Sequence, residues 1–255
     1  MPLPKINTPT YEFVIPSTGK KIRYRPFLVK EEKILIMAME SEDVTQITNA
    51  VKDVIKSCIS TRGVKVEQLA TFDIEYLFLN IRGKSVGEEV QVLVTCPDDG
   101  ETKVPTTIAL DDIMIQVDEN HSRDIRLDEN LTLRMKYPSM DQFVKNNFAM
   151  SDINVDDTFE IIGSCIEQIY NEEESWSAKD CTKKEIRDFL EQLSSKQFKE
   201  VEDFFVTMPK LSHTIKVKNP NTEVENDILL EGLASFFALV WLILTLSHTF
   251  ELILP

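Results

Sequence analysis

The first residues alternate between apolar and polar side chains, which predicts a β-hairpin. The alternation runs to Ile15, the chain turns through a Pro-Ser-Thr-Gly sequence, and the alternation resumes at Ile22. Because successive side chains of a strand point to opposite faces, we expect one buried and one wet face. The apolar positions are Tyr11, Phe13, Ile15, Ile22 and Tyr24.

Apolar spacings of three and four residues follow and predict three helices. The first is expected near residues 29–40 and the second over 43–59. The third, over 71–85, has a wider apolar face, with Thr71 or Asp73 available as N-cap. The apolar positions of the second helix are Val44, Ile47, Val51, Val54 and Cys58, and those of the third are Ile74, Leu77, Phe78 and Ile81.

The middle of the chain returns to strand patterns. Two strands are expected around the turn Pro97-Asp98-Asp99-Gly100, because Asp and Gly adopt turn backbones readily. Asp98 and Asp99 also suit a metal ion, but no third ligand stands nearby, so the plain turn is the preferred interpretation. A further strand pair is predicted over residues 124–138.

From residue 138 onward the pattern predicts mainly helices, with an acidic loop over 171–180. Three capping boxes mark helix starts, at Ser139 with Gln142, Thr182 with Glu185, and Ser194 with Gln197. The helical stripes are Phe159, Ile162, Ile166 and Ile169; Ile186, Phe189, Leu190 and Leu193; and Phe198, Val201, Phe205 and Met208.

A closing hairpin is predicted around residues 219–221, with Ile215 and Val217 on one face. The fold class is therefore α+β, with β-hairpins near both ends and in the middle around amphipathic helices, and a mainly helical C-terminal half. The chain divides into an N-terminal α+β region over 1–137, a mainly helical region with the closing hairpin over 138–237, and an apolar tail over 238–255.

The net charge and the positions of the cysteines exclude some classes of function. A formal charge of −15 opposes binding to phosphate backbones, so nucleic acid is not expected as a partner. The four cysteines stand far apart, which argues against a zinc site and favours buried free thiols in a reducing compartment. The N-terminus has early prolines and no apolar core of a secretory signal, so synthesis in the cytoplasm is expected.

No pattern of catalytic residues is evident. None of the seven glycines falls in a phosphate-binding motif, and the three histidines lie outside metalloprotease spacing. The acidic pairs Asp111-Asp112 and Asp156-Asp157 are better explained as groups that favour helix starts than as general acids and bases. We therefore expect no enzyme activity, catalytic residue, cofactor or metal.

Several blocks of the sequence together resemble one protein family. They are INTPTYEFVIPSTGKKIRYRPFLVKEEKILIMAMES, FDIEYLFLNIRGKSVGEEV, CPDDG and HTIKVKNPNTEVENDILLEGLASFF. These blocks, between about residue 4 and Phe237, are similar to the baseplate hub subunit and hub-assembly family of T-even-like contractile-tailed bacteriophages. The resemblance implies a structural or assembly protein of the tail baseplate hub that acts through protein contacts and has no catalytic residues.

The resemblance leaves several roles open. The chain could be a component of the finished virion, located in the tail baseplate. It could instead be a transient tail-assembly chaperone in the host cytoplasm, for example for the tape-measure protein, or a membrane-associated assembly factor. The expected partners are other phage baseplate hub and tail proteins, with membrane contact as the weaker alternative.

The apolar tail after Phe237 departs abruptly from the charged composition before it, and a change of reading frame is one hypothesis for it. The 18 uncharged residues from Leu233 to Phe250 just reach the length of a membrane span, yet no Lys or Arg flanks them. The tail could also be a core helix or a partner-docking helix. For docking, the predicted contact residues are Phe236, Phe237, Leu239, Trp241, Leu242 and Leu246.

Overall fold

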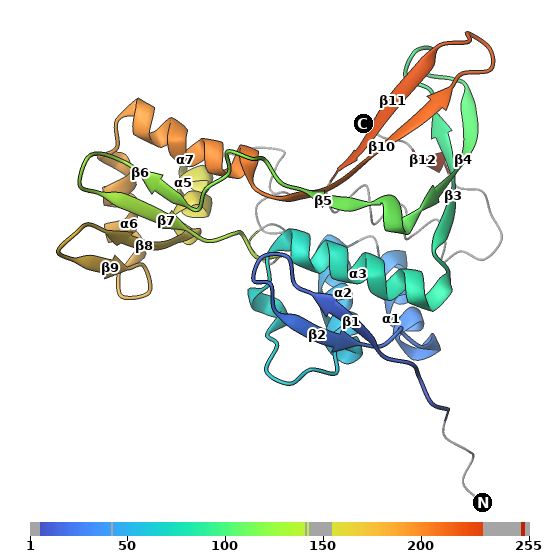
Figure 1. The fold of residues 1–255 in the computed structure, drawn as a ribbon, viewed down its shortest axis with the longest axis horizontal. Helices are drawn as coiled ribbons and strands as arrows, with labels where there is room; N and C mark the ends of the chain where they lie inside the picture. Colours follow the sequence, from blue (N-terminus) through green and yellow to red (C-terminus); the bar gives the residue numbers. More distant parts are fainter. Residues whose placement is uncertain (1–5, 42, 141, 143–154, 232–250, 253–255) are drawn as a thin grey trace, which may run out of the picture. The chain divides into compact units, whose positions relative to one another are not determined.

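The computed structural model describes residues 6–41, 43–140, 142, 155–231 and 251–252. It divides the chain into two compact units (Figure 1). Unit 1 comprises the residues up to Gln116 and those from Lys210 onward, and unit 2 comprises Val117–Pro209. Unit 2 is thus inserted into unit 1 between two strands that pair with each other, since Gln116 lies opposite Lys210.

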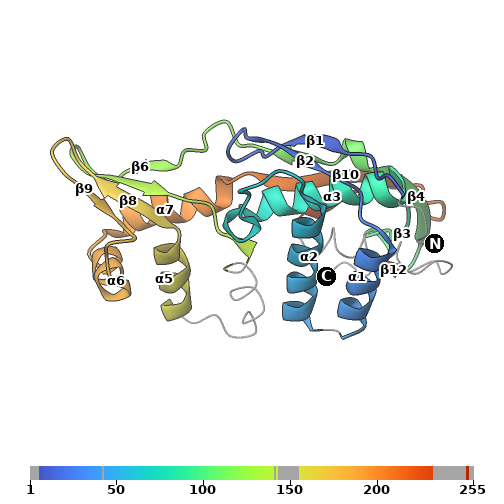
Figure 2. The same cartoon turned by 90° about the horizontal axis from the view of Figure 1, so that it is seen from below.

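The N-terminal half of unit 1 follows the predicted order of elements. The hairpin consists of β1 (Tyr11–Val14) and β2 (Lys21–Tyr24). It is followed by α1 (Val29–Glu40), α2 (Val44–Cys58), the short helix η1 (Val66–Gln68) and α3 (Thr71–Val86). Helices α1 and α2 lie side by side (Figure 2). The predicted hairpin and all three helices are therefore confirmed.

Helix α3 is buried on nearly all sides, which explains its wide apolar face. Its predicted N-cap is wrong, because the N-cap position is Ala70. Asp73 instead accepts hydrogen bonds from the amide of Ala70 at 3.2 Å and from the amide and hydroxyl of Ser17 at 2.9 and 2.5 Å. One carboxylate therefore both completes the helix start and fastens the turn of the β1–β2 hairpin to it.

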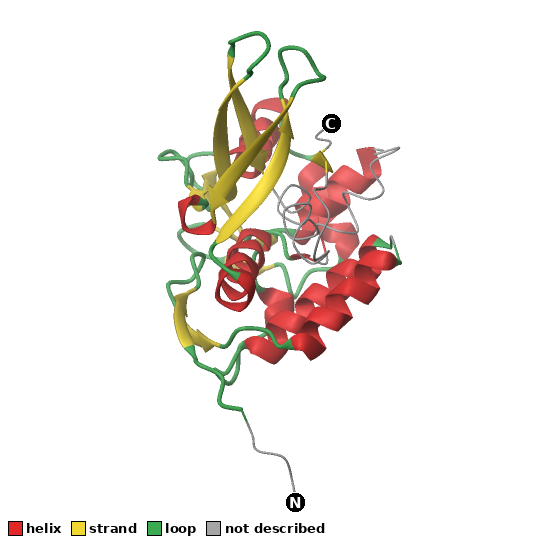
Figure 3. Cartoon of the chain, turned by 90° about the vertical axis from the view of Figure 1, so that its right-hand side faces the viewer, coloured by secondary structure: helices red, strands yellow, loops and turns green. Residues whose placement is uncertain are grey.

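Two long hairpins complete unit 1 (Figure 1). The first joins β3 (Glu89–Thr95) to β4 (Lys103–Ala109), and the second joins β10 (Lys210–Lys218) to β11 (Glu225–Glu231). The chain between β4 and unit 2 forms η2 (Leu110–Asp112) and β5 (Met114–Gln116), and β5 pairs with β10. In Figure 3 these two hairpins lie above the helices of unit 1. Their buried residues form one apolar cluster with Leu79 of α3, which includes Val92, Val94, Ile215, Val217 and Ile228.

The described residues of unit 2 form a four-stranded antiparallel sheet with three helices on one face (Figure 2). The strand order is β6 (Asp124–Arg126), β7 (Thr132–Met135), β8 (Ile166–Tyr170) and β9 (Ser175–Ser177). The helices are α5 (Val155–Ser164), α6 (Lys183–Glu191) and α7 (Ser195–Thr207). The core combines Leu133 and Ile166 of the sheet with Ile162, Leu190 and Val201 of the helices.

Two predictions for this region are wrong. The apolar stripe from Phe159 to Ile169 was predicted to lie on one helix. Helix α5 ends at Ser164 instead, and Ile166 and Ile169 lie in strand β8, because this segment pairs with β7. The acidic loop over 171–180 contains β9, which closes a hairpin with β8. The α+β class is confirmed. A mainly helical C-terminal half is not confirmed, because its described residues also form the strands β8 to β11. The expected boundary near residue 137 also runs through this sheet, since β7 pairs with β8.

The capping boxes at Thr182 and Ser194 are confirmed. Each hydroxyl accepts a hydrogen bond from the amide of the third helical residue, and the side chain of that residue accepts one from the amide of the N-cap residue. At the third site the amide of Ser139 donates to Gln142 at 2.8 Å. The cysteines are free thiols as predicted, buried at Cys58, Cys96 and Cys165 and half-buried at Cys181.

The apolar tail lies almost entirely outside the described residues. The part that is described, β12 (Glu251–Leu252), pairs with β3 in the parallel direction, opposite Leu93 and Val94. Among the described helices, none combines the length and the apolar character that a membrane crossing requires. The two described residues of the tail therefore pair with a strand of unit 1.

Candidate interaction surfaces

The tips of the two long hairpins are joined by a network of side-chain hydrogen bonds. Asn219, which is fully buried, donates from its amide nitrogen to both oxygens of Asp98 at 3.0 and 3.1 Å and to Asp99 at 2.9 Å. Asn226 donates to Asp98 at 3.0 Å, and Thr222 also donates to Asp98. These bonds hold the pKa of the Asp98 carboxyl below its ordinary range, with the bond from Asn219 as the largest cause.

The hydrogen bonds of this network distinguish a turn from a metal site at Asp98 and Asp99. Asp99 also accepts from the hydroxyl and amide of Thr102 at 2.5 and 2.9 Å, which lowers its pKa as well. The oxygens that a metal ion would need are therefore directed at Asn and Thr donors, which supports the predicted turn. Within the described residues no group of three or more His, Cys, Asp or Glu side chains is arranged to hold a metal ion.

Replacing Asn219 with alanine is expected to lower the free energy of unfolding by about 1–3 kcal/mol, because it removes several bonds to carboxylates and separates the hairpin tips. Chemical denaturation measures the loss, and hydrogen exchange should show faster exchange in the turns of both hairpins. Asn130→Ala, at an exposed position in a turn of unit 2, is the control and should change stability by less than about 0.5 kcal/mol. Equal effects of the two substitutions would contradict a joining role for Asn219.

His121 is held in an aromatic cluster and does not resemble a catalytic base. Its ring nitrogens lie 3.0 Å from the Thr207 hydroxyl and 3.1 Å from the Tyr137 hydroxyl. The ring packs against Tyr137 and Phe204, with centroids 5.6 and 5.2 Å apart. Burial lowers the pKa of His121. Both nitrogens thus face hydroxyls of the unit 2 core, which makes this histidine a packing residue.

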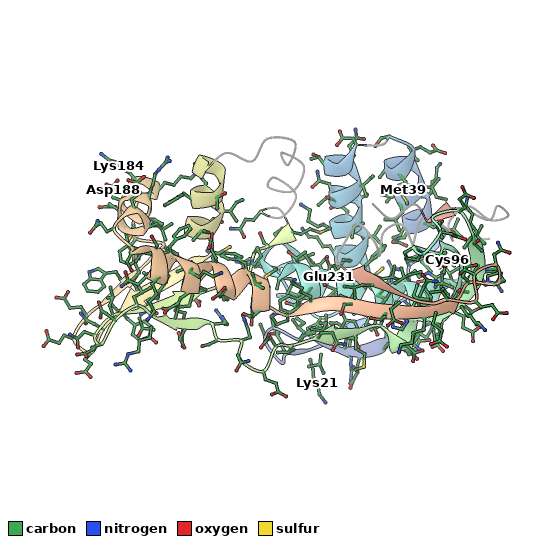
Figure 4. All side chains as sticks on the ribbon, turned by 90° about the horizontal axis from the view of Figure 1, so that it is seen from above. Lys21, Met39, Cys96, Lys184, Asp188 and Glu231 are labelled. Carbon is green, nitrogen blue, oxygen red and sulfur yellow. The ribbon has the colours of Figure 1, made fainter. Side chains whose placement is uncertain are left out.

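A hollow of about 500 Å³ lies between α5 and α6, and its lining contains no histidine or cysteine. The exposed side of α6 beside it carries charged residues, including Lys184 and Asp188 (Figure 4). The acidic pair Asp111-Asp112 lies within η2 and is exposed. The hydroxyl of Ser164, in the lining of the hollow, donates to the carbonyl oxygen of Ile161 at 2.8 Å.

Exposed apolar side chains instead concentrate on helix α1. Val29, Ile34 and Met37 are 79%, 45% and 60% exposed, although Leu35 and Met39 of the same helix are buried. Large exposed apolar side chains grouped on one element are typical of protein contact surfaces, and methionine adapts well to different partners. The sequence analysis missed this surface. Its signal is the unbroken apolar run ILIMAM over 34–39, which covers more of the helix than a single buried stripe requires.

The predicted contact residues of the tail lie outside the described residues, and their role stays a prediction. They are Phe236, Phe237, Leu239, Trp241, Leu242 and Leu246.

Fold and surfaces together define a protein of two small α+β units whose described features suit contact with other proteins. The sequence matches the T4 bacteriophage base plate protein family over residues 8–238, and the chain belongs to that family. It is 26% identical over 233 residues to the baseplate hub assembly protein gp26 of Enterobacteria phage T4, covering 90% of this chain and 99% of that protein. No solved structure matches the chain. The family match ends where the apolar tail begins, and this is a family of baseplate proteins rather than a known enzyme family.

Proposed function

We propose that the chain is a bacteriophage baseplate hub protein that acts in tail assembly through contacts with other baseplate proteins, without catalysis. The observation that carries the proposal is the family match over residues 8–238, together with the similarity to a baseplate hub assembly protein over nearly its whole length. The exposed apolar surface of α1 supports it. The acidic charge of −15 also supports it, because like-charged surfaces repel and restrict the choice of partners.

Assembly is proposed to take place in the host cytoplasm. The finer roles differ in whether the chain remains in the particle. A hub component stays in the baseplate, whereas a chaperone, for example one that shields the tape-measure protein, leaves before the particle is complete. If the apolar segment 238–255 attaches the chain to a membrane, deleting these residues should reduce the amount of membrane-bound protein.

The experiment is quantitative mass spectrometry of purified tails and of assembly complexes from infected-cell lysate. We expect the chain in stoichiometric amounts with baseplate hub proteins in the lysate complexes. Presence in purified tails at a fixed ratio to hub proteins assigns a structural component, and presence in the lysate complexes alone assigns a transient factor. Absence from every complex that contains a hub protein would contradict the proposal.

A further inference from the structure

The outer edge of the unit 2 sheet is a short strand with an exposed tryptophan. Strand β9 (Ser175–Ser177) is the last strand in the order β6-β7-β8-β9, and Trp176 is 41% exposed. An edge strand presents main-chain groups that can pair with another chain. Tryptophan at a contact surface contributes more to binding than most residues do. These two features make β9 a candidate docking edge.

The main-chain groups of Ser175 and Ser177 point away from β8. The amide of Asn171 donates to Glu174 at 2.9 Å, and the amide of Ala178 donates to Glu167 at 3.1 Å. Antiparallel ladders alternate between bonded and non-bonded pairs, so Trp176, midway between them, is bonded to Ile169. Ser175 and Ser177 fall in the non-bonded pairs. Ser175 directs its N–H and C=O groups, and Ser177 its N–H group, to the open edge, while the carbonyl of Ser177 accepts the amide of Asp180 at 3.0 Å and the thiol of Cys181 at 3.4 Å.

Trp176 continues a row of core side chains beyond the cover of the helices. The register places Ile125 opposite Leu133, Leu133 opposite Ile169, and Ile169 opposite Trp176, so all four side chains share one face of the sheet. Leu133 is fully buried and Ile169 partly buried, whereas Trp176 at the edge is the most exposed of the row. A strand added beside β9 would place its own apolar residue next in this row.

The charge around the edge specifies the partner. Glu172, Glu173 and Glu174 lead into β9 and are all exposed. Between Val117 and Pro209 the sequence has 21 acidic and 11 basic residues, so this unit carries −10 of the total charge of −15. A second copy of so acidic a surface is repelled, whereas lysine or arginine side chains are attracted.

We propose that β9 is a docking edge that adds a basic, extended segment of another baseplate protein as a fifth strand of the unit 2 sheet. The segment pairs with the N–H and C=O groups of Ser175 and with the N–H group of Ser177, packs an apolar residue against Trp176, and places cations near Glu172–Glu174. This inference rests on the proposed function, since it requires a baseplate partner.

The test measures the affinity of the full chain for each purified hub and tail protein of the same phage, by calorimetry at two salt concentrations. Ser175→Pro removes an outward N–H and leaves the β8–β9 ladder intact, so it should weaken binding by about tenfold or more. Ser175→Ala keeps that N–H and is the matched control, with unchanged affinity expected. Replacing Glu172, Glu173 and Glu174 with glutamine should weaken binding and reduce its salt dependence.

The outcomes separate the inference from the proposed function. If a hub protein binds and the Ser175→Pro and glutamine variants bind it as tightly as the wild type, the docking edge is overturned and the proposed function stands. If no hub or tail protein binds the wild type, both are overturned. If Ser175→Pro converts a dimer of the chain to monomers in sedimentation, the occupant is a second copy and the basic partner is excluded. Unchanged circular dichroism of Ser175→Pro shows that the variant is folded.

Discussion

Replacing Arg25 with methionine is expected to lower the free energy of unfolding by about 3–5 kcal/mol, because the buried carboxylate of Glu31 then keeps only the exposed Lys30, 3.3 Å away, as a cation. Arg25 Nη2 lies 2.9 Å from Glu31 Oε1, and the Glu31 side chain is only 3% exposed. The amide of Leu28 also donates to Glu31 at 2.9 Å. The pair fastens the end of β2 to the first turn of α1. Urea denaturation of the purified chain at neutral pH measures the loss.

The loss of stability in Arg25→Met is expected to depend on pH, because it depends on the ionisation of Glu31. Burial alone would raise the pKa of Glu31, but the hydrogen bonds from Arg25 and Leu28 outweigh it and hold the pKa below its ordinary value. The stability contributed by a carboxyl with a lowered pKa is present above the unfolded pKa and is lost as the pH falls through the folded value. The penalty of Arg25→Met should therefore be largest near neutral pH and shrink in acid.

Two variants control the Arg25 measurement. Arg23 pairs with Glu12 at 3.5 Å, but both side chains are more than half exposed, so Arg23→Met should cost less than about 1 kcal/mol. Adding Glu31→Gln to Arg25→Met removes the buried charge and should recover a large part of the loss. If Arg23→Met and Arg25→Met cost the same, the buried ion pair does not have the role assigned to it.

Replacing Glu75 with glutamine is expected to stabilise the chain above about pH 7 by removing a buried acid that must ionise. Glu75 lies in α3 and is 7% exposed. Burial, with a further contribution from the charge of Glu231, raises the pKa of Glu75 to about 8. Figure 4 shows Glu231 on strand β11. The unfolded carboxyl loses its proton near pH 4.5, so between these values the folded state holds the extra proton.

Stability from this group is therefore complete below the unfolded pKa and is lost as the pH rises through about 8. The wild type should lose on the order of 3–5 kcal/mol over this range through Glu75, and Glu75→Gln should not. Since other carboxyls titrate too, the quantity to measure is the difference between variant and wild type across pH. Glu225→Gln, at an exposed position of β11, is the control and should track the wild type. A Glu75→Gln profile parallel to the wild type would contradict the prediction.

Local sequence patterns predicted much of the fold because they reflect local physics. The stripe of α2, the capping boxes at Thr182 and Ser194 and the turn at Asp98-Asp99 each follow from neighbouring residues. Strand β8 was missed since Ile166 and Ile169 are three residues apart, a spacing that fits a helix until β7 is there to pair with it. Strand β9 is too short for alternation to register.

The candidate surfaces depend on contacts between distant parts of the chain, and this limited their prediction. Asn219 and Asp98 are 121 residues apart, and each alone reads as an ordinary turn residue. The exposure of Trp176 became evident only once the register placed it at the end of a row that begins in the core. The pattern at α1 was visible as an apolar run, but only the packing separates its buried side from its exposed side.

The most direct test of the central claim, that the chain works through contacts in assembling the baseplate hub, is an infection in which its gene is disabled. Tail intermediates from the lysate are then separated by sedimentation, with hub proteins quantified in each fraction. The account predicts that hub proteins remain unassembled or in incomplete baseplates, and that supplying the wild-type chain from a plasmid restores complete tails. Normal yields of infectious particles with complete hubs in the absence of the chain would contradict it.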